Sequence, residues 1–152
     1  MKKILTLCLI RKDSKILLGM KRRGFGEGKW NGFGGKVEPG ETLEAAIIRE
    51  VLEESKLIVN NLEPMGDIEF SFENNPIIFH VHYFKTSNFT GEPKETEEMA
   101  TPQWFNLNEL PLDQMWPEAK IVFPKLLADK KITGKILYNQ SGDAIIRNEL
   151  RS

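Results

Sequence analysis

The sequence predicts a domain of the α/β class, in which β-strands and helices are combined. Three observations support this prediction. Short apolar runs separated by turn-forming residues indicate strands near both ends of the chain, a helix-like run extends from Thr42 to about Ser55, and residues 67–73 alternate between polar and apolar side chains. A length of 152 residues suits one domain with a sizeable core, and no repeat or linker interrupts it. We therefore expect a single domain over residues 1–152.

Composition and charge argue against several classes of protein. The formal net charge is −1, whereas proteins that bind nucleic acids usually carry a basic excess. The apolar run 4–10 is too short to span a bilayer, and it ends in charged residues without a signal-peptide cleavage site. Cys8 stands alone in that run and is expected to be a buried small hydrophobe. We expect a cytoplasmic monomer with no nucleic-acid or membrane partner.

The N-terminal part predicts a strand, a turn and a strand over residues 4–10, 11–15 and 16–20. The loop 21–28 that follows contains three cations and three glycines. Lys21 lies closest to the strand end and is the better candidate for a phosphate contact, whereas Arg22 and Arg23 fit a solvated loop. Residues 32–35 then contain three glycines, which indicates tight backbone geometry or close approach of a ligand to the main chain.

The helix expected from Thr42 to about Ser55 carries apolar residues on the first half of one face and carboxylates on the second half. Glu50, Glu53 and Glu54 lie three and four residues apart, so they share one side of the helix. Clustered acids repel one another and lose hydration, a conflict that Mg²⁺ or Mn²⁺ removes. The alternative is a surface helix whose glutamates are solvated, with Arg49 as their ion-pair partner.

The C-terminal half predicts mostly strands. Residues 67–73 and 77–85 form a hairpin around the turn 74–76, and residues 132–138 and 144–146 form another. Between them we expect an acidic loop (90–101), a strand (103–105), a short helical turn (107–110), and a helix that begins near Pro117 and kinks or restarts at Pro124. His80 and His82 share a strand face, and they are interpreted as surface residues because no third metal ligand lies nearby.

The glycine-rich loop and the acidic helix together form a recognisable motif. Gly35, Glu41, Arg49-Glu50-Val51 and Glu53-Glu54 stand at the spacing of the signature box of the Nudix hydrolases, and the chain resembles that family. The resemblance implies Mg²⁺-dependent cleavage of a nucleoside diphosphate linked to another moiety. Beyond the box, the segments LLGMKRRGFGEGKWNGFGGKVEPGET, HVHYF, EMATPQWF and MWPE resemble the MutT-related branch of oxidised purine nucleoside triphosphate hydrolases, the mammalian-type 8-oxo-dGTP diphosphatases.

The resemblance implies an α/β/α sandwich with a mixed central sheet and the box loop and helix packed against it. It assigns the metal to the Gly34 carbonyl and to the carboxylates of Glu50, Glu53, Glu54 and Glu98. Glu53 is the first choice for the base that accepts a proton from water, and Glu98 is the second. Arg49 completes the catalytic set by holding Glu41 and the loop. Mg²⁺ is the expected cofactor, with Mn²⁺ as a possible substitute.

The resemblance also assigns a binding site for a nucleoside triphosphate, which would be hydrolysed to a nucleoside monophosphate and pyrophosphate. The residues near the phosphates and around the base are Thr6, Lys21, Asn31, Phe33, Gly34, Gly35, Lys36, Phe70, Phe72, Phe79, Trp116, Pro117, Glu118 and Ala119.

Two positions depart from the family pattern. Lys56 stands where the box normally ends in glycine, so we expect an altered helix end without loss of the chemistry. Glu118 and Ala119 stand where this branch has two adjacent acids that bind the purine edge. The preferred base therefore stays open among oxidised, methylated and plain purines. A non-catalytic nucleotide sensor is a further alternative, although such a protein is expected to have lost the box carboxylates.

Overall fold

The computed structural model describes residues 1–152 and contains ten strands, two α-helices and one 3-10 helix. In chain order the elements are β1 (Lys2–Lys12), β2 (Lys15–Met20), β3 (Trp30–Asn31), α1 (Leu43–Ser55), β4 (Ile58–Asn60), β5 (Glu63–Phe72), β6 (Ile78–Thr86), β7 (Asn88–Thr90), β8 (Gln103–Asn106), η1 (Leu112–Gln114), α2 (Ala119–Leu127), β9 (Ile132–Tyr138) and β10 (Ile145–Arg151). The three predicted strand pairs at the N-terminus, in the middle and at the C-terminus are confirmed.

The main sheet has eight strands and is mixed. Seven strands follow the order β10-β9-β5-β6-β1-β2-β3, and β8 pairs with β2. The pairs β1–β6 and β5–β9 are parallel, whereas the other neighbours are antiparallel. The β1–β6 register places Leu5 beside Val81 and Leu7 beside Tyr83, so these alternate apolar side chains share one face of the sheet. Strands β4 and β7 form a separate two-stranded sheet.

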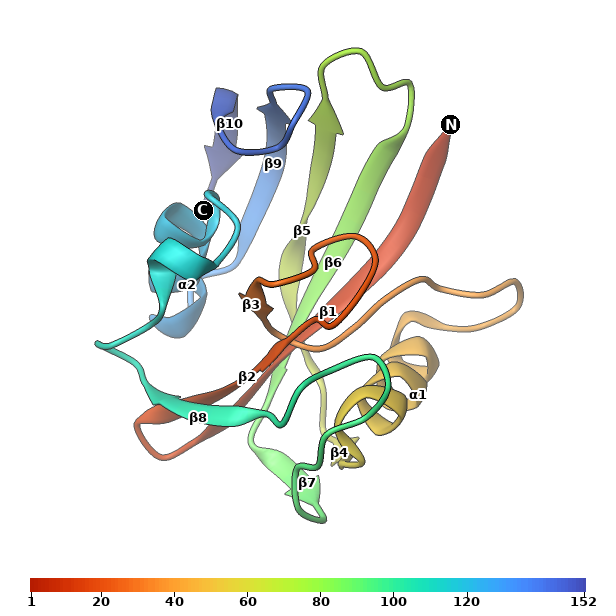
Figure 1. Ribbon diagram of the computed structural model, residues 1–152, viewed down its shortest axis with the longest axis vertical. Helices are drawn as coiled ribbons and strands as arrows, with labels where there is room; N and C mark the ends of the chain where they lie inside the picture. Colours follow the sequence, from red (N-terminus) through yellow and green to blue (C-terminus); the bar gives the residue numbers. More distant parts are fainter.

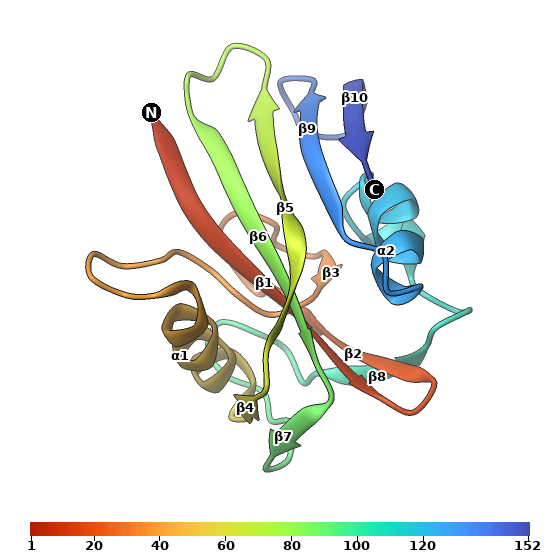
Figure 2. The same cartoon turned by 180° about the vertical axis from the view of Figure 1, so that it is seen from behind.

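The two helices cover opposite faces of the sheet (Figures 1 and 2). On one face, Ile47 and Val51 of α1 belong to a buried apolar cluster with Cys8 of β1. On the other face, Val122 and Phe123 of α2 belong to a larger cluster that also contains residues of β5 and β9. The predicted α/β/α sandwich is therefore confirmed. Neither helix has the length and apolar character needed to cross a membrane.

Helix α1 begins and ends at the predicted residues, but its C-terminal end is not altered in the way that Lys56 predicted. The Thr42 hydroxyl accepts the N–H of Ala45 at 3.1 Å, which caps the first turn. At the other end Lys56 adopts the left-handed conformation (φ 68°), and its N–H donates to the Leu52 carbonyl at 3.0 Å. The prediction that Lys56 alters the end of the helix is therefore wrong. Lys56 accepts a conformation that costs a non-glycine residue about 1–2 kcal/mol, while the Lys94 N–H binds the Ser55 carbonyl at 2.9 Å and holds this end in place.

The region around α2 corrects two predictions. The helical turn expected at residues 107–110 lies later, as the 3-10 helix Leu112–Gln114. Helix α2 then runs from Ala119 to Leu127 as one element that contains Pro124, so the expected restart does not occur. Pro124 removes the N–H that would bind the Lys120 carbonyl. Both residues are exposed, so water can replace the lost hydrogen bond and the helix stays continuous.

Candidate active site

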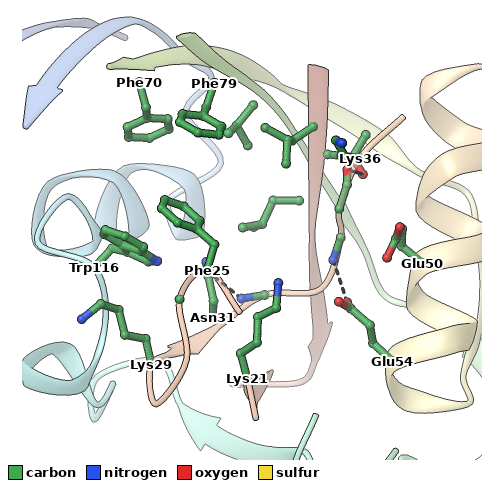
Figure 3. Close-up of a pocket in the computed structure, with 18 of the residues that line it drawn as sticks. Lys21, Phe25, Lys29, Asn31, Lys36, Glu50, Glu54, Phe70, Phe79 and Trp116 are labelled. Atoms are coloured by element: carbon green, nitrogen blue, oxygen red, sulfur yellow. Dashed lines mark hydrogen bonds between the residues drawn. The ribbon is translucent and has the colours of Figure 1, made fainter. Parts of the chain in front are cut away.

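A cavity of about 590 Å³ extends from the second half of α1 to the start of α2 (Figure 3). Its lining divides into two parts. The acidic end consists of Glu50, Glu53, Glu54 and Glu98 with the lysines Lys21 and Lys36. The aromatic end consists of Phe25, Phe70, Phe72, Phe79, Trp116 and Tyr138, together with Glu118. The rest of the lining includes apolar residues of β1 and β6, several glycines, Lys29 and Asn31.

The most buried carboxylate of the acidic end belongs to Glu54, which is 6% exposed. Its Oε1 accepts the N–H of Gly34 at 3.0 Å (Figure 3). Burial raises the pKa of Glu54 to about 8, and the charges of Glu50 and Glu98 act in the same direction, whereas the Gly34 hydrogen bond and the charge of Lys21 oppose the shift. Burial also raises the pKa of Glu50, against the opposing effect of Arg49. The acidic end therefore carries an electrostatic conflict that the protein groups only partly relieve.

The loop before α1 lies very close to β1 and to the Glu50 side chain of the helix, so that two of its positions leave little room for a side chain. Residues 33–37 run beside β1, with hydrogen bonds from Thr6 N–H to the Gly35 carbonyl (2.9 Å) and from Val37 N–H to the Ile4 carbonyl (3.0 Å). A Cβ on Gly34 would lie 2.0 Å from the Thr6 carbonyl oxygen, and one on Gly35 would lie 2.7 Å from the Glu50 carboxyl carbon. Gly34 requires glycine, because a side chain there would separate the loop from the backbone of β1, whereas a side chain at position 35 would displace the Glu50 carboxylate.

Arg49 ties this loop to the helix. Its Nε and one terminal nitrogen donate to the two Glu41 carboxylate oxygens at 2.7 and 2.8 Å, and that terminal nitrogen also donates to the Lys36 carbonyl at 3.0 Å. The other terminal nitrogen donates to Glu50 at 2.9 Å. These contacts hold the pKa of Glu41 down at about 2. The arrangement agrees with the positioning role that the sequence predicts for Arg49.

Glu98 reaches the cavity from a different part of the chain. An isolated β-bridge pairs Lys21 with Met99, and the Arg22 N–H donates to the Glu98 carbonyl at 2.9 Å, so the end of β2 carries Glu98 toward α1. The Glu98 carboxylate accepts a hydrogen bond from Arg23 at 3.1 Å. Arg22 pairs with Glu95 in the same way, so these two arginines bind the acidic loop and are not simply solvated.

The four carboxylates surround one cavity, but each lies against a protein group, and Glu50 and Glu53 share Arg49. As the side chains stand, no three His, Cys, Asp or Glu residues are close enough to hold a metal ion together. Glu50 is turned to Arg49, Glu54 to Gly34 N–H and Glu98 to Arg23. The Glu53 side chain is 55% exposed and lies 3.5 Å from Arg49. The metal-binding assignment thus stays a prediction, and it would need side-chain rotation toward the cavity centre.

The aromatic end surrounds Phe25, which projects from the loop after β2 (Figure 3). The Phe25 ring stacks on Phe79 with a centroid distance of 5.4 Å and lies 5.0 Å from the Trp116 ring. Although Phe25 makes these contacts, it is 60% exposed. Lys29 lies over the Trp116 ring, with its Nζ 5.2 Å from the ring centroid. Flat apolar faces of this kind suit a planar heteroaromatic group.

Glu118 is the carboxyl group of the aromatic end. It immediately precedes α2, and its N–H donates to the Tyr138 hydroxyl at 3.1 Å. Burial raises the pKa of Glu118 to about 7, whereas hydrogen bonds from Tyr138 and from backbone N–H groups, and the charge of Lys29, lower it. A buried carboxyl group among aromatic rings can bind the polar edge of a ligand that the rings stack against.

The structure brings most of the predicted site residues together. The predicted residues that line the cavity are Thr6, Lys21, Asn31, Gly34, Gly35, Lys36, Glu50, Glu53, Glu54, Phe70, Phe72, Phe79, Glu98, Trp116 and Glu118. The Thr6 hydroxyl donates to the Gly35 carbonyl at 3.4 Å. The histidines are elsewhere, as expected. They alternate with the cavity residues along β6, and His80 Nε2 lies 2.6 Å from Asp67.

Three predicted binding residues do not line the cavity, and a binding role for them stays a prediction. Phe33 is fully buried in the cluster beneath α1, because its side chain points to the face of the sheet opposite to the aromatic end. Ala119 is 1% exposed in the core beneath α2, one helix position beyond Glu118, and its short side chain turns inward. Pro117 lies in the turn before α2 and is likewise absent from the lining.

Sequence reasoning missed three side chains that complete the aromatic end. Phe25 carried a signal, since it is the one large apolar residue in the glycine-rich loop 21–28. Lys29 and Tyr138 carried none. Tyr138 lies 20 positions from Glu118, and only the pairing of β9 with β5 brings its ring against Phe72, with a centroid distance of 5.2 Å.

Comparisons with known proteins agree with this geometry. The family model of the NUDIX domain matches residues 1–126. Two proteins named oxidized purine nucleoside triphosphate hydrolase are similar over nearly their whole length. The one from Danio rerio is 47% identical over 148 residues (97% of this chain and 94% of that protein), and the one from Mus musculus is 46% identical over 149 residues (98% and 94%).

More distant relatives extend the comparison. The crystal structure of a MutT protein from Bacillus halodurans has a TM-score of 0.83 and 26% identity, with 98% of this chain and 96% of that chain covered. The NAD-capped RNA hydrolase NudC from Vibrio cholerae is 34% identical over 103 residues, but the match covers only 36% of that protein. Similarity over the whole length therefore distinguishes the first two relatives from NudC.

Proposed function

This chain belongs to the Nudix hydrolase family, and from that membership we propose that it hydrolyses oxidised purine nucleoside triphosphates to a nucleoside monophosphate and pyrophosphate. The observation that carries the proposal is the single cavity that joins an acidic end to an aromatic end. A purine nucleoside triphosphate has the matching polarity, with a flat base at one end and a polyphosphate that binds metal ions at the other. Sequence identity of 46–47% with two proteins named oxidized purine nucleoside triphosphate hydrolase supports the choice of oxidised purine nucleotides as substrates.

Nudix hydrolases generally need a divalent metal, and we propose Mg²⁺, with Mn²⁺ as a substitute. The donor set fits such an ion, because four carboxylates line one cavity and the most buried of them has its pKa raised to about 8 by burial and by neighbouring acids. The residues that would hold it are Gly34, through its carbonyl, with Glu50, Glu53, Glu54 and Glu98. When bound, Mg²⁺ neutralises phosphate charge and increases the acidity of coordinated water.

The residues of the chain supply the rest of the chemistry. Lys21 and Lys36 lie beside the acidic end, where their charges favour a polyphosphate. Glu53 is the proposed base, since its side chain is open to solvent (55% exposed) and can accept a proton from an attacking water. Glu98 is the second candidate for that role. Arg49 holds the loop and Glu41 in place and does not contact the substrate.

The test is steady-state release of pyrophosphate from a panel of purine nucleoside triphosphates, with and without Mg²⁺. We expect turnover only with the metal, and a higher kcat/KM for 8-oxo-dGTP than for dGTP. Equal values for oxidised, methylated and plain purines would indicate a broad pyrophosphohydrolase. Failure to hydrolyse any of them would contradict the proposal and favour a non-catalytic nucleotide sensor.

The proposal includes a monomer in the cytoplasm that acts on free nucleotides. The formal net charge of −1 supports free nucleotides as the substrates, because a nucleic-acid substrate would favour a basic surface. Sedimentation of the purified chain at several concentrations tests the oligomeric state.

A further inference from the structure

Tyr138 stands out among the cavity residues because its ring is locked and its hydroxyl is not free to rotate away. It is the last residue of β9 and is 1% exposed. Its ring stacks on Phe72 with a centroid distance of 5.2 Å and lies 5.8 Å from the ring of Trp116. A tyrosine has only two side-chain torsions, so this packing leaves its hydroxyl oxygen at one fixed point of the aromatic end.

That fixed hydroxyl is bound to Glu118. The oxygen accepts the backbone N–H of Glu118 at 3.1 Å. Its own proton is then free for another acceptor, and Tyr138 is the first of the groups that lower the pKa of Glu118 against the effect of burial. The facing charge from another element is that of Lys29. The phenol thus binds the backbone of the residue that precedes α2, and its proton can turn to the carboxylate of the same residue.

The position of the Tyr138 hydroxyl matters because the Glu118 side chain is flexible, whereas recognition of a base needs one orientation of its carboxyl group. A glutamate has three torsions, and fixing them costs free energy on binding unless another group has already restricted them. In this cavity the second acid position is not available, since Ala119 is buried in the core and does not line the cavity. A base at the aromatic end therefore meets a single carboxyl group, and its recognition depends on where that group is held.

We propose that Tyr138 is a specificity-determining positioning residue, whose hydroxyl holds the Glu118 carboxyl group toward the edge of the purine. The proposal rests on the proposed function, since it names how that function distinguishes among bases. Tyr138 acts through Glu118 and does not need to contact the substrate itself.

The experiment is a double-mutant cycle in kcat/KM for 8-oxo-dGTP, with Tyr138→Phe, Glu118→Ala and the two combined. Phenylalanine retains the stacked ring and removes only the hydroxyl. We expect Tyr138→Phe to lower kcat/KM about tenfold in the native background, mainly through a higher KM. In the Glu118→Ala background the same change should lower kcat/KM less than about threefold, because the group it positions is already gone.

Equal losses in both backgrounds would overturn the proposal, since the Tyr138 hydroxyl would then act independently of the Glu118 side chain. No loss in either background would overturn it as well. A second measurement needs no substrate and checks the contact directly. The carboxyl ¹³C resonance of Glu118 is titrated in the native protein and in Tyr138→Phe. Loss of the hydrogen bond should raise the pKa of Glu118, and identical titration curves would refute the contact.

The two measurements separate this inference from the proposed function. If the native chain hydrolyses no purine nucleoside triphosphate, the proposed function fails, whatever the titration shows. If the native chain is active and the cycle shows no coupling, only the role of Tyr138 fails.

Discussion

The two ends of the cavity each contain a buried carboxyl group, and the groups around them differ. Glu54 has acids as neighbours, since Glu50 and Glu98 add to the effect of burial and raise its pKa to about 8. Glu118 has hydrogen-bond donors as neighbours, and its pKa of about 7 reflects burial that Tyr138 and Lys29 oppose. The same kind of group therefore suits two different tasks. Carboxylates with like-charged neighbours favour a bound cation, whereas hydrogen-bond donors hold a carboxyl group in the orientation that recognition of a ligand needs.

The two ends also differ in how the chain builds them. Most of the acidic end comes from the continuous segment 34–54, in which one loop and one helix suffice to place three carboxylates. The aromatic end takes its rings from the loop after β2, from β5, β6 and β9, and from the turn before α2. We therefore expect substitutions at the acidic end to change turnover, and substitutions at the aromatic end to change affinity and base selectivity.

The largest effect expected at the acidic end is that of Glu53→Gln. This change should lower kcat by roughly 100- to 10,000-fold, because a general base is lost, while KM and the melting temperature stay close to native, since the side chain is 55% exposed. Steady-state kinetics with 8-oxo-dGTP and Mg²⁺ measures it. Glu44→Gln is the matched control, on the exposed first turn of the same helix. A native kcat in Glu53→Gln would refute the base assignment.

At the aromatic end, Phe25→Ala should act on affinity. Stacking of a base on an aromatic ring contributes about 1–3 kcal/mol, so KM should rise about tenfold with little change in kcat. The fold should be unaffected because the ring is 60% exposed. Glu27→Ala, in the same loop and outside the cavity, is the control. A loss confined to kcat would contradict the expectation that the aromatic end sets affinity and the acidic end sets turnover.

The pH dependence of stability should separate Glu54 from Glu118. Both folded pKa values are raised above the ordinary 4.5, so between 4.5 and the raised value the folded state binds more protons than the unfolded state. Stability should therefore fall as pH rises, the reverse of the usual case for carboxyl groups. For Glu54 the fall extends to about pH 8, and for Glu118 to about pH 7.

Melting temperatures without metal over this pH range give the test. Glu54→Gln should flatten the curve up to about pH 8, and Glu118→Gln only up to about pH 7. Mg²⁺ added at pH 8 should raise the melting temperature of the native protein more than that of Glu54→Gln, because binding to the folded state stabilises it. An equal increase in both proteins would remove Glu54 from the metal site.

The smallest effect concerns the end of α1. Lys56→Gly should stabilise the protein by about 1 kcal/mol, because glycine adopts the left-handed conformation without strain. Unfolding in urea measures the difference, and kcat should not change. Lys56→Ala is the control, since it removes the charge and retains the strain. Stabilisation by alanine to the same extent would show that charge and not backbone conformation sets the cost at this end of the acidic helix.

How much the sequence predicts depends on the range of the interactions. The spacing of Glu50, Glu53 and Glu54 places them on one side of α1 whatever surrounds the helix, because helical geometry alone relates residues three and four apart. Thr42 as the cap and Gly35 at the close approach follow from equally local rules. The acidic helix of the Nudix box was predictable for this reason, and the sandwich fold followed from the resemblance to the family.

Where the chain depends on distant contacts, local rules were not enough. The face to which Phe33 points, the burial of Ala119 and the solvent position that lets Pro124 stay within α2 depend on how separate elements pack. Phe25, Lys29 and Tyr138 come together only because strand pairing and loop packing bring residues 25 to 138 around one cavity. The sequence by itself determined the family, the helix and its acids, whereas the tertiary structure decided which side chains form the aromatic end, because side-chain direction across a sheet follows from register and packing.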